Sequence, residues 1–180
     1  MLIAIAPAAA MEETIINFNT GYFGIGGNFP LGDSYDLEGS VTLINIGMEN
    51  RWINIGFEFS PLQLYGWSGG NADAFDDITG ISLFNMRAYW TPLSLLENVF
   101  YLGPFTSVSY FFVNDAFLWN RYVFTAGGQA GLRLAYRGIH YNIFVAEAGY
   151  RNINGRNKYY VGAKIDILAF LLFAFMAQSD

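Results

Sequence analysis

Cysteine is absent from the 180 residues, which excludes disulfide bonds, thiol chemistry and thiolate metal sites. Lysine occurs only twice, and the formal net charge is -6. Because binding to nucleic acid depends on clustered Lys and Arg, we expect no nucleic-acid partner. Charged residues make up 13% of the chain, against a usual share of about 25%, while 53% is hydrophobic. A chain so poor in charge is expected to meet a solvent other than water on part of its surface.

Long apolar runs are also missing. The N-terminal "MLIAIAPAAA" and the C-terminal "ILAFLLFAFMA" are both shorter than the ~20 residues that an α-helix needs to cross a bilayer, so no transmembrane helix is predicted. The first run ends in small residues, as the cleavage site of a secretory signal does, although a basic start is missing. We therefore expect residues 1–10 to be a signal-peptide remnant and residues 11–180 to form a single domain.

Period-2 alternation of apolar and polar residues recurs from about residue 15 to 173 and is interrupted by segments rich in Gly, Asn, Asp and Pro. It predicts eight strands, at about 15–28, 39–48, 53–59, 84–90, 99–112, 121–136, 139–150 and 158–173. The second strand is blurred, because Val41 and Leu43 differ in parity from Ile44 and Ile46, and a β-bulge is expected there. Short and longer connections roughly alternate, which is typical of an up-and-down antiparallel barrel in a membrane.

Alternation alone does not separate a membrane barrel from a soluble lipocalin-like barrel, because the two differ only in which face points outward. The charged residues within strands decide between them. Five lie on the face opposite the apolar one, namely Glu58, Arg87, Arg133, Lys164 and Asp166, whereas Glu147 shares the parity of the apolar face. An unpaired Arg or Lys in lipid would cost about 2–4 kcal/mol at the bilayer midplane. We therefore expect an all-β, eight-stranded antiparallel up-and-down transmembrane β-barrel, with the five charges forming a network in its lumen.

Aromatic residues gather where the two rims of such a barrel are expected. One group lies near the short connections (Trp52, Trp90, Tyr101, Tyr136 and Tyr141), and another lies near the longer ones (Tyr110, Tyr122, Tyr150 and Tyr159). Amphipathic rings favour the level of the lipid headgroups, so the pattern predicts two aromatic girdles.

With this strand number and loop asymmetry, the chain resembles the small eight-stranded outer-membrane barrels of Gram-negative bacteria, the OmpA, OmpX and OmpW group. The last predicted strand, "YYVGAKIDILAFLLF", is similar to the family's C-terminal assembly signal, with an aromatic residue at Phe173. In the family that residue ends the chain, whereas "AFMAQSD" follows it here. The resemblance implies that the protein lies in the bacterial cell outer membrane, with outer-membrane lipid and the barrel-assembly machinery as partners.

Two functions without catalysis are compatible with this fold. In the first, the barrel is a structural or surface-interaction protein, and loops 30–38 and 60–80 contact an extracellular ligand or a host surface. In the second, it is an OmpW-like narrow channel for small hydrophobic molecules, because four apolar residues have inward parity near the long-loop end: Phe23, Ile25, Phe105 and Phe111. Eight strands leave little room for an open pore, so we expect the lumen charges to plug the barrel rather than to gate it.

Enzymatic function is the weakest hypothesis. A lipid-modifying barrel enzyme would need a histidine as the general base for a serine, and Asn142 stands two residues after the single histidine, His140, where that serine would be required. Asp73, Asp76 and Asp77 lie close together in a Gly-rich loop but lack the spacing of a calcium loop. We therefore expect no catalytic residue, no cofactor and no metal site.

Overall fold

The computed structural model describes residues 14–29, 36–69, 78–96, 99–113, 122–136, 139–153 and 156–177. Eight long strands account for most of them: β1 (Thr14–Phe29), β2 (Asp36–Asn50), β3 (Ile55–Gly69), β4 (Ile78–Trp90), β6 (Phe100–Val113), β7 (Tyr122–Tyr136), β8 (Ile139–Ile153) and β9 (Arg156–Asp166). A short strand, β5 (Leu93–Leu95), pairs with β6, and a helix, α1 (Ile167–Ala177), follows β9. Within the described ranges, no helix is both long enough and apolar enough to cross a membrane.

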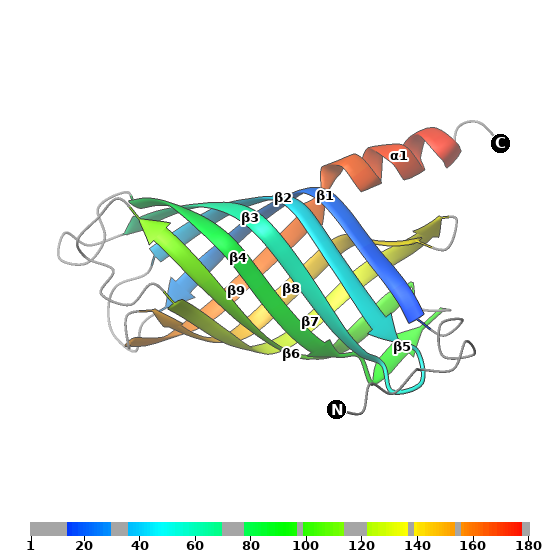
Figure 1. Cartoon of the computed structure of the whole chain (residues 1–180), viewed down its shortest axis with the longest axis horizontal. Helices are drawn as coiled ribbons and strands as arrows, with labels where there is room; N and C mark the ends of the chain where they lie inside the picture. Colours follow the sequence, from blue (N-terminus) through cyan, green and yellow to red (C-terminus); the bar gives the residue numbers. More distant parts are fainter. Residues whose placement is uncertain are drawn as a thin grey trace, which may run out of the picture.

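Each long strand pairs antiparallel with its neighbours in sequence, and pairing of β1 with β9 closes the sheet into a barrel. Figure 1 shows the strands wrapping obliquely around one axis, with β5 at one end of the barrel. The described short connections, such as the turn at 51–54, lie at the same end as β5. The predicted all-β, eight-stranded antiparallel up-and-down barrel is therefore confirmed. Closure gives the first and last strands a partner and so leaves fewer unpaired backbone groups at an edge.

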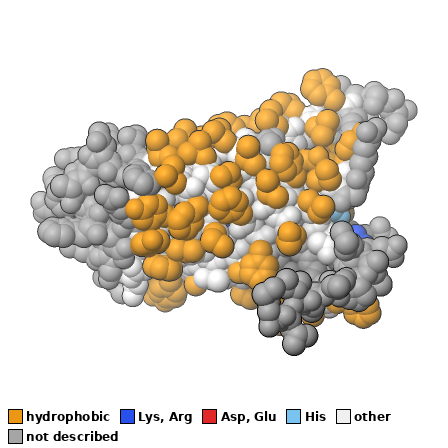
Figure 2. All heavy atoms as spheres, viewed as in Figure 1, with side chains coloured by type: hydrophobic (Ala, Val, Ile, Leu, Met, Phe, Trp, Pro, Cys, Tyr) orange, Lys and Arg blue, Asp and Glu red, His pale blue; other side chains and the backbone are white. Residues whose placement is uncertain are grey.

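Side chains are distributed in the reverse of the usual order. Among the described residues, 22 buried side chains are polar or charged and only 12 are hydrophobic, whereas 37 large hydrophobic side chains are exposed. Figure 2 shows hydrophobic side chains spread over the middle of the barrel on the face in view, and no acidic side chain is visible on that face. The core of the barrel is therefore polar, and its wall is apolar.

Two interruptions of the strand pattern change which residues face inward. The expected bulge in the second strand is confirmed, since the register of β2 against β3 shifts between Thr42 and Ile46. In β1, Gly21 has a φ of 75°, a left-handed conformation that favours glycine. Odd-numbered residues of β1 are buried before Gly21, whereas even-numbered residues such as Tyr22 are buried after it. The two faces of β1 are thus exchanged at Gly21.

The strand predicted at 158–173 is wrong in its second half. β9 ends at Asp166, and residues 167–177 form α1. Alternation stops at this point because "ILAFLLFAFMA" is apolar at every position, and Ala, Leu, Phe and Met follow Ile167 without another β-branched residue. Asp166 also provides a helix N-cap, since its Oδ1 accepts a hydrogen bond of 2.9 Å from the backbone N–H of Ala169. The second half of the segment compared with a C-terminal assembly strand, which includes Phe173, is therefore helical.

Candidate functional site

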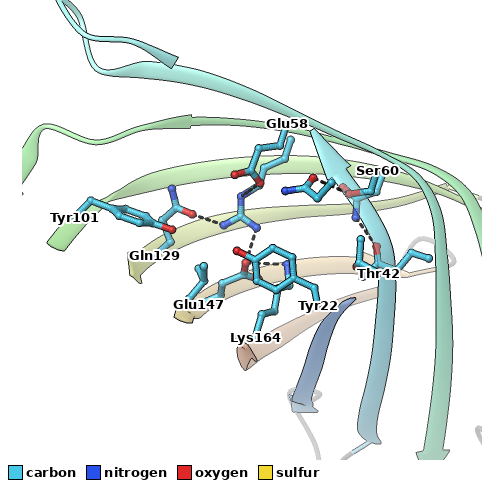
Figure 3. A pocket seen from close by; sticks show the side chains of 13 residues that line it. Tyr22, Thr42, Glu58, Ser60, Tyr101, Gln129, Glu147 and Lys164 are labelled. Carbon is cyan, nitrogen blue, oxygen red and sulfur yellow. Dashed lines mark hydrogen bonds and ion pairs between the residues drawn. The ribbon is translucent and has the colours of Figure 1, made fainter. Parts of the chain in front are cut away.

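The polar interior of the barrel is the candidate functional site, and Arg87 of β4 lies at its centre. The two terminal nitrogens of Arg87 donate hydrogen bonds to Glu147 of β8 and Gln129 of β7. Lys164 of β9 binds the same carboxylate oxygen as Arg87, with 2.9 Å between its Nζ and Glu147 Oε1. Glu58 of β3 is 4.0 Å from Arg87 Nε. Figure 3 shows Glu58, Gln129, Glu147 and Lys164 converging from different strands on one small space.

A second cluster fills the end of the barrel that carries the short turns. Arg133 Nη2 is 2.9 Å from Glu49 Oε2, and both side chains are almost completely buried. The same carboxylate accepts hydrogen bonds of 3.1 Å from the hydroxyl groups of Tyr89 and Thr91. Tyr89 in turn accepts one of 2.7 Å from the Asn17 side chain. Glu49 is therefore held by a charged donor from β7 and by two neutral donors, one in β4 and one just after it.

Asn142 connects the two clusters. Its side-chain oxygen accepts a hydrogen bond of 3.0 Å from Arg133 Nε, and its side-chain nitrogen donates one of 3.1 Å to Glu58. Asn142 is only 1% exposed, so these hydrogen bonds replace its contacts with water. The polar network thus continues from the short-turn end to the middle of the barrel.

A third ion pair lies toward the long-loop end, where Arg151 of β8 pairs with Glu38 of β2. Arg151 Nε also donates a hydrogen bond of 3.1 Å to Thr125. The rings of Tyr65 and Phe111 meet edge to face beside this pair, with 4.8 Å between their centroids. Polar and aromatic groups therefore occupy this level of the interior together.

An aromatic ring also lies beneath each of the three buried arginines. The guanidinium carbon lies 3.7–4.6 Å from the ring centroid in each of three pairs, which are Arg87 with Phe105, Arg133 with Tyr101 and Arg151 with Tyr160. A cation over the face of a ring is attracted by the ring's quadrupole, and the attraction is stronger where water is excluded. Each arginine is therefore held by a carboxylate and by a ring. The permanent charge of the guanidinium suits the first contact, and its planar shape suits the second.

Little space remains between these side chains. One cavity, bordered by Arg87 and Glu147, has a volume of about 30 Å³, and a second cavity near Arg151 has about 10 Å³. A cavity needs about 10–15 Å³ to hold one water molecule. These two cavities therefore have room for only a few water molecules, and neither is a continuous pore.

The five lumen charges predicted from the sequence all lie on the inner side of the wall. The network joins four of them, since Glu58, Arg87 and Lys164 meet around Glu147 and Arg133 joins through Asn142. The fifth, Asp166, is fully buried but lies apart, where it accepts a hydrogen bond of 2.8 Å from Asn19 and caps α1. The role of these residues as a functional site stays a prediction.

Glu147 was assigned to the outer face by parity, and that assignment is wrong. A register shift between β7 and β8 leaves Ile143 as an extra residue, so Asn142 and Ile143 are both buried and the parity of β8 reverses. Four further charges, which were not among the predicted lumen charges, are buried inside the barrel as well: Glu38, Glu49, Arg151 and Lys158. The sequence could have indicated them, because each is spaced by two residues from another inward position. Arg151, for example, follows Glu147 and Gly149 at this spacing.

The predicted apolar upper lumen is formed by only two of its four residues. Phe105 and Phe111 are buried inside the barrel. Phe23 and Ile25 are 44% and 74% exposed on the outer wall, because the faces of β1 exchange at Gly21. Arg87 covers the ring of Phe105, so this part of the interior is not a continuous apolar surface. The channel for hydrophobic molecules stays a prediction, with Phe105 and Phe111 as its inward residues.

His140 is buried at the short-turn end opposite Asn17 of β1, and the amide of Asn142 is engaged by Arg133 and Glu58. In the described part of the chain, no three His, Asp or Glu side chains are placed to share a metal ion. The aspartates at 73, 76 and 77, the loop at 30–35 and residues 1–13 lie outside the described residues. The expectations of no enzyme activity, no cofactor and a signal peptide stay predictions.

Comparison of the chain with protein families, with curated proteins and with solved structures gives no match. The geometry of the interior is therefore the basis for a functional proposal. Its ion pairs and ring contacts occupy much of the space inside the barrel.

Proposed function

We propose that this chain is an integral outer-membrane β-barrel protein of the small OmpA-like kind, with a structural or surface-interaction role. The observation that carries the proposal is the inverted distribution of side chains: the wall is apolar, and the buried interior is predominantly polar. An outer-membrane barrel has an apolar band facing lipid and a polar interior, whereas a soluble barrel turns its polar face to water.

The energetic argument supports lipid as the solvent of the wall. Soluble monomers rarely expose a contiguous apolar patch larger than a few hundred Å², and burial from water contributes about 25 cal/mol per Å² of apolar surface. Exposed wall residues such as Ile25, Met48, Phe57 and Phe124 come from four different strands of the barrel. Among the strand side chains that the structure describes, none with a charge is exposed. A wall of this kind is favourable in hydrocarbon and unfavourable in water.

Aromatic residues at both ends of the wall support the same environment. Trp52 and Trp90 are exposed at the short-turn end, and Tyr150 and Tyr159 are exposed toward the other end with 3.0 Å between their hydroxyl oxygens. Amphipathic rings at two levels are typical of the two membrane interfaces. Tyr101, which was assigned to the first girdle, is buried inside the barrel instead.

The filled interior favours a structural or surface-interaction role over transport. In this proposal, the barrel anchors its loops at the cell surface, where they meet an extracellular ligand or a host surface, and no chemical reaction takes place in the lumen. Outer-membrane lipid surrounds the wall, and the barrel-assembly machinery inserts it. The plug of paired charges fixes the register of the strands and keeps the envelope sealed.

Cell fractionation tests this proposal. The full-length chain is expressed in a Gram-negative host, and inner and outer membranes are separated before electrophoresis with and without boiling. We expect the protein in the outer-membrane fraction, with a band that changes mobility on boiling because the closed barrel resists detergent at low temperature. Recovery in the soluble fraction, with the same mobility before and after boiling, would instead support a lipocalin-like barrel.

A further inference from the structure

The wall of the barrel has a seam between β1 and β8. β9 ends opposite Tyr22, which is the ninth of the 16 residues of β1, so the remaining part of β1 loses its neighbour on this side. β1 and β8 then meet directly, in parallel, at Ile16 with Ile139 and at Asn17 with His140. Eight long strands therefore form the wall near the long loops, whereas seven long strands and the short β5 form it near the short turns.

Between the β1–β8 pairing and the end of β9, hydrogen bonds from side chains close this seam in place of a backbone ladder. The backbone carbonyl of Asn142 in β8 accepts hydrogen bonds of 3.1 Å from the Asn19 side chain and 2.7 Å from the Tyr22 hydroxyl. Asn19 also donates a hydrogen bond of 2.8 Å to Asp166, which is fully buried. The polar groups that β9 would have paired here are thus partly satisfied from within the barrel.

Helix α1 covers the outside of the seam. It packs against β1 and β8, and the ring of Phe173 meets that of Tyr141 edge to face at a centroid distance of 5.9 Å. A side chain at Gly21 would come within 3.3 Å of Leu168, so the absence of one lets the helix lie close to β1. Figure 1 shows α1 leaving the wall after β9 and running outside the barrel toward the end where β5 lies.

The rest of the helix surface is exposed and apolar. Ile167, Leu168, Phe170, Leu171, Leu172 and Phe175 are 39–69% exposed, whereas Ala169 is buried. Helices that are hydrophobic all round lie in a protein core or in a membrane. The exposed surface of α1 continues the apolar wall of the barrel, so the same solvent is expected to cover both.

The length of α1 fits half of a bilayer. Its 11 residues extend about 16 Å at a rise of 1.5 Å per residue. Half of a hydrocarbon core is about 15 Å thick. The helix starts halfway along β1 and runs toward the short-turn end. In the sequence it is followed by the polar residues Gln178, Ser179 and Asp180.

On these grounds, and resting on the proposed membrane location, we propose that α1 is a half-span membrane helix. It takes the place of the missing half of β9 in the wall and binds the acyl chains of the leaflet at the short-turn end. The hydrocarbon covers the exposed sides of the helix, and the helix in turn shields the side-chain seam from lipid. Asp166 anchors it, because one carboxylate oxygen caps the helix while the other binds Asn19 inside the barrel.

The absence of cysteine allows a direct test with single fluorescent labels. Ile167→Cys, Leu171→Cys and Phe175→Cys lie along one side of α1, and Met48→Cys on β2 is the control for the barrel wall. Each variant is labelled with an environment-sensitive fluorophore and reconstituted in phosphatidylcholine vesicles that carry nitroxide groups at a deep or a shallow position of the acyl chain. Heat-modifiable mobility identifies folded protein, and Phe170→Cys replaces any α1 variant that fails to fold.

The half-span helix predicts a gradient of depth. Positions 167 and 175 differ by about 12 Å along the helix axis, so quenching by the deep nitroxide should dominate at 167 and quenching by the shallow nitroxide at 175. Equal depth at all three positions would overturn the half-span arrangement. Quenching by aqueous iodide on α1, with Met48 still quenched by lipid, would overturn the inference and leave the barrel's membrane location intact.

Two further outcomes separate the remaining alternatives. Energy transfer between labels on α1 of different copies, together with loss of quenching by lipid, would show that a second copy covers the helix, and it would overturn lipid as the partner. Quenching of the Met48 label by iodide would overturn the membrane location itself, and the inference with it.

Discussion

Removing the carboxylate of Glu147 should destabilise the barrel more than any other single change in its central cluster. Glu147 is 4% exposed and neutralises both Arg87 and Lys164. Breaking a buried ion pair by removing one partner costs about 3–5 kcal/mol, because the other charge stays buried without compensation. The Lys164 side chain is 22% exposed, and Glu58 remains 4.0 Å from Arg87, so both cations keep part of their stabilisation. We therefore expect Glu147→Leu to lower the free energy of unfolding by about 3 kcal/mol, the low end of that range.

Equilibrium urea unfolding in detergent micelles, followed by the fluorescence of the four tryptophans, measures this change. Glu147→Gln is the first control, because it keeps an acceptor oxygen and removes only the charge, and it should lose less than Glu147→Leu. The double variant Arg87→Met/Glu147→Leu is the second control. Since it replaces the ion pair with apolar groups of similar size, it should be more stable than Glu147→Leu alone.

Two results would refute this reasoning. A loss of less than about 1 kcal/mol in Glu147→Leu would show that water reaches the cluster and solvates both cations, as it does for surface ion pairs. A double variant whose loss equals the sum of its two single losses would show that Arg87 and Glu147 are not coupled.

Three further predictions concern the wall, the seam and the lumen. Gly21→Ala should lower the free energy of unfolding by about 1–2 kcal/mol, because Gly21 has a φ of 75°. Gly39→Ala should change it little, because a Cβ there meets nothing within 4 Å, and equal urea midpoints for the two variants would contradict this prediction. Leu132 lies on the exposed wall, so Leu132→Arg should lower the free energy of unfolding in lipid vesicles by about 2–4 kcal/mol, and Leu132→Ala should lower it less. An unchanged stability of Leu132→Arg would argue against lipid at this position. The purified barrel should give no steady ion conductance in planar bilayers, and Arg87→Ala/Gln129→Ala should introduce a small one; a conducting native barrel would contradict a plugged lumen.

Much of the barrel could be predicted from the sequence, because apolar side chains of the wall alternate with inner side chains along its strands. The alternation of Phe57 and Phe59 with Glu58 and Ser60 in β3 appears directly in the structure as exposed and inner residues. The inward position of Arg87 and Arg133 followed from the same rule. Alternation of this kind is local, so it needs no knowledge of which strands are neighbours.

Positions beyond an irregularity could not be placed in this way. An extra residue, as at Ile143, or a residue in the left-handed conformation, as at Gly21, exchanges the two faces of a strand, so every assignment after it is reversed. Phe23 and Ile25 follow Gly21, and Glu147 follows Ile143, and all three were assigned to the wrong face for this reason. A glycine inside a strand is a signal for such a change, but the sequence does not show which of several glycines adopts the left-handed conformation.

The alternation of apolar and polar residues also could not predict which lumen charges form pairs. Glu49 and Arg133 come from β2 and β7, which are not neighbours in the sheet, and they meet only because the barrel closes.

The end of β9 was missed for another reason. An apolar run such as residues 167–177 is compatible with a helix as well as with a buried strand, and length and residue type alone separate the two.

Contact between the outer wall and lipid is the central claim, and collision of single nitroxide labels with oxygen or with a water-soluble nickel chelate tests it most directly. Phe124 and Thr125 are adjacent in β7, and they are 52% and 5% exposed on opposite faces. We expect a label at Phe124, and a second one at Phe57 of β3, to collide with oxygen and to be protected from the chelate in vesicles, whereas a label at Thr125 is shielded from the lipid phase. Free access of the nickel chelate to Phe57 and Phe124 would contradict the claim.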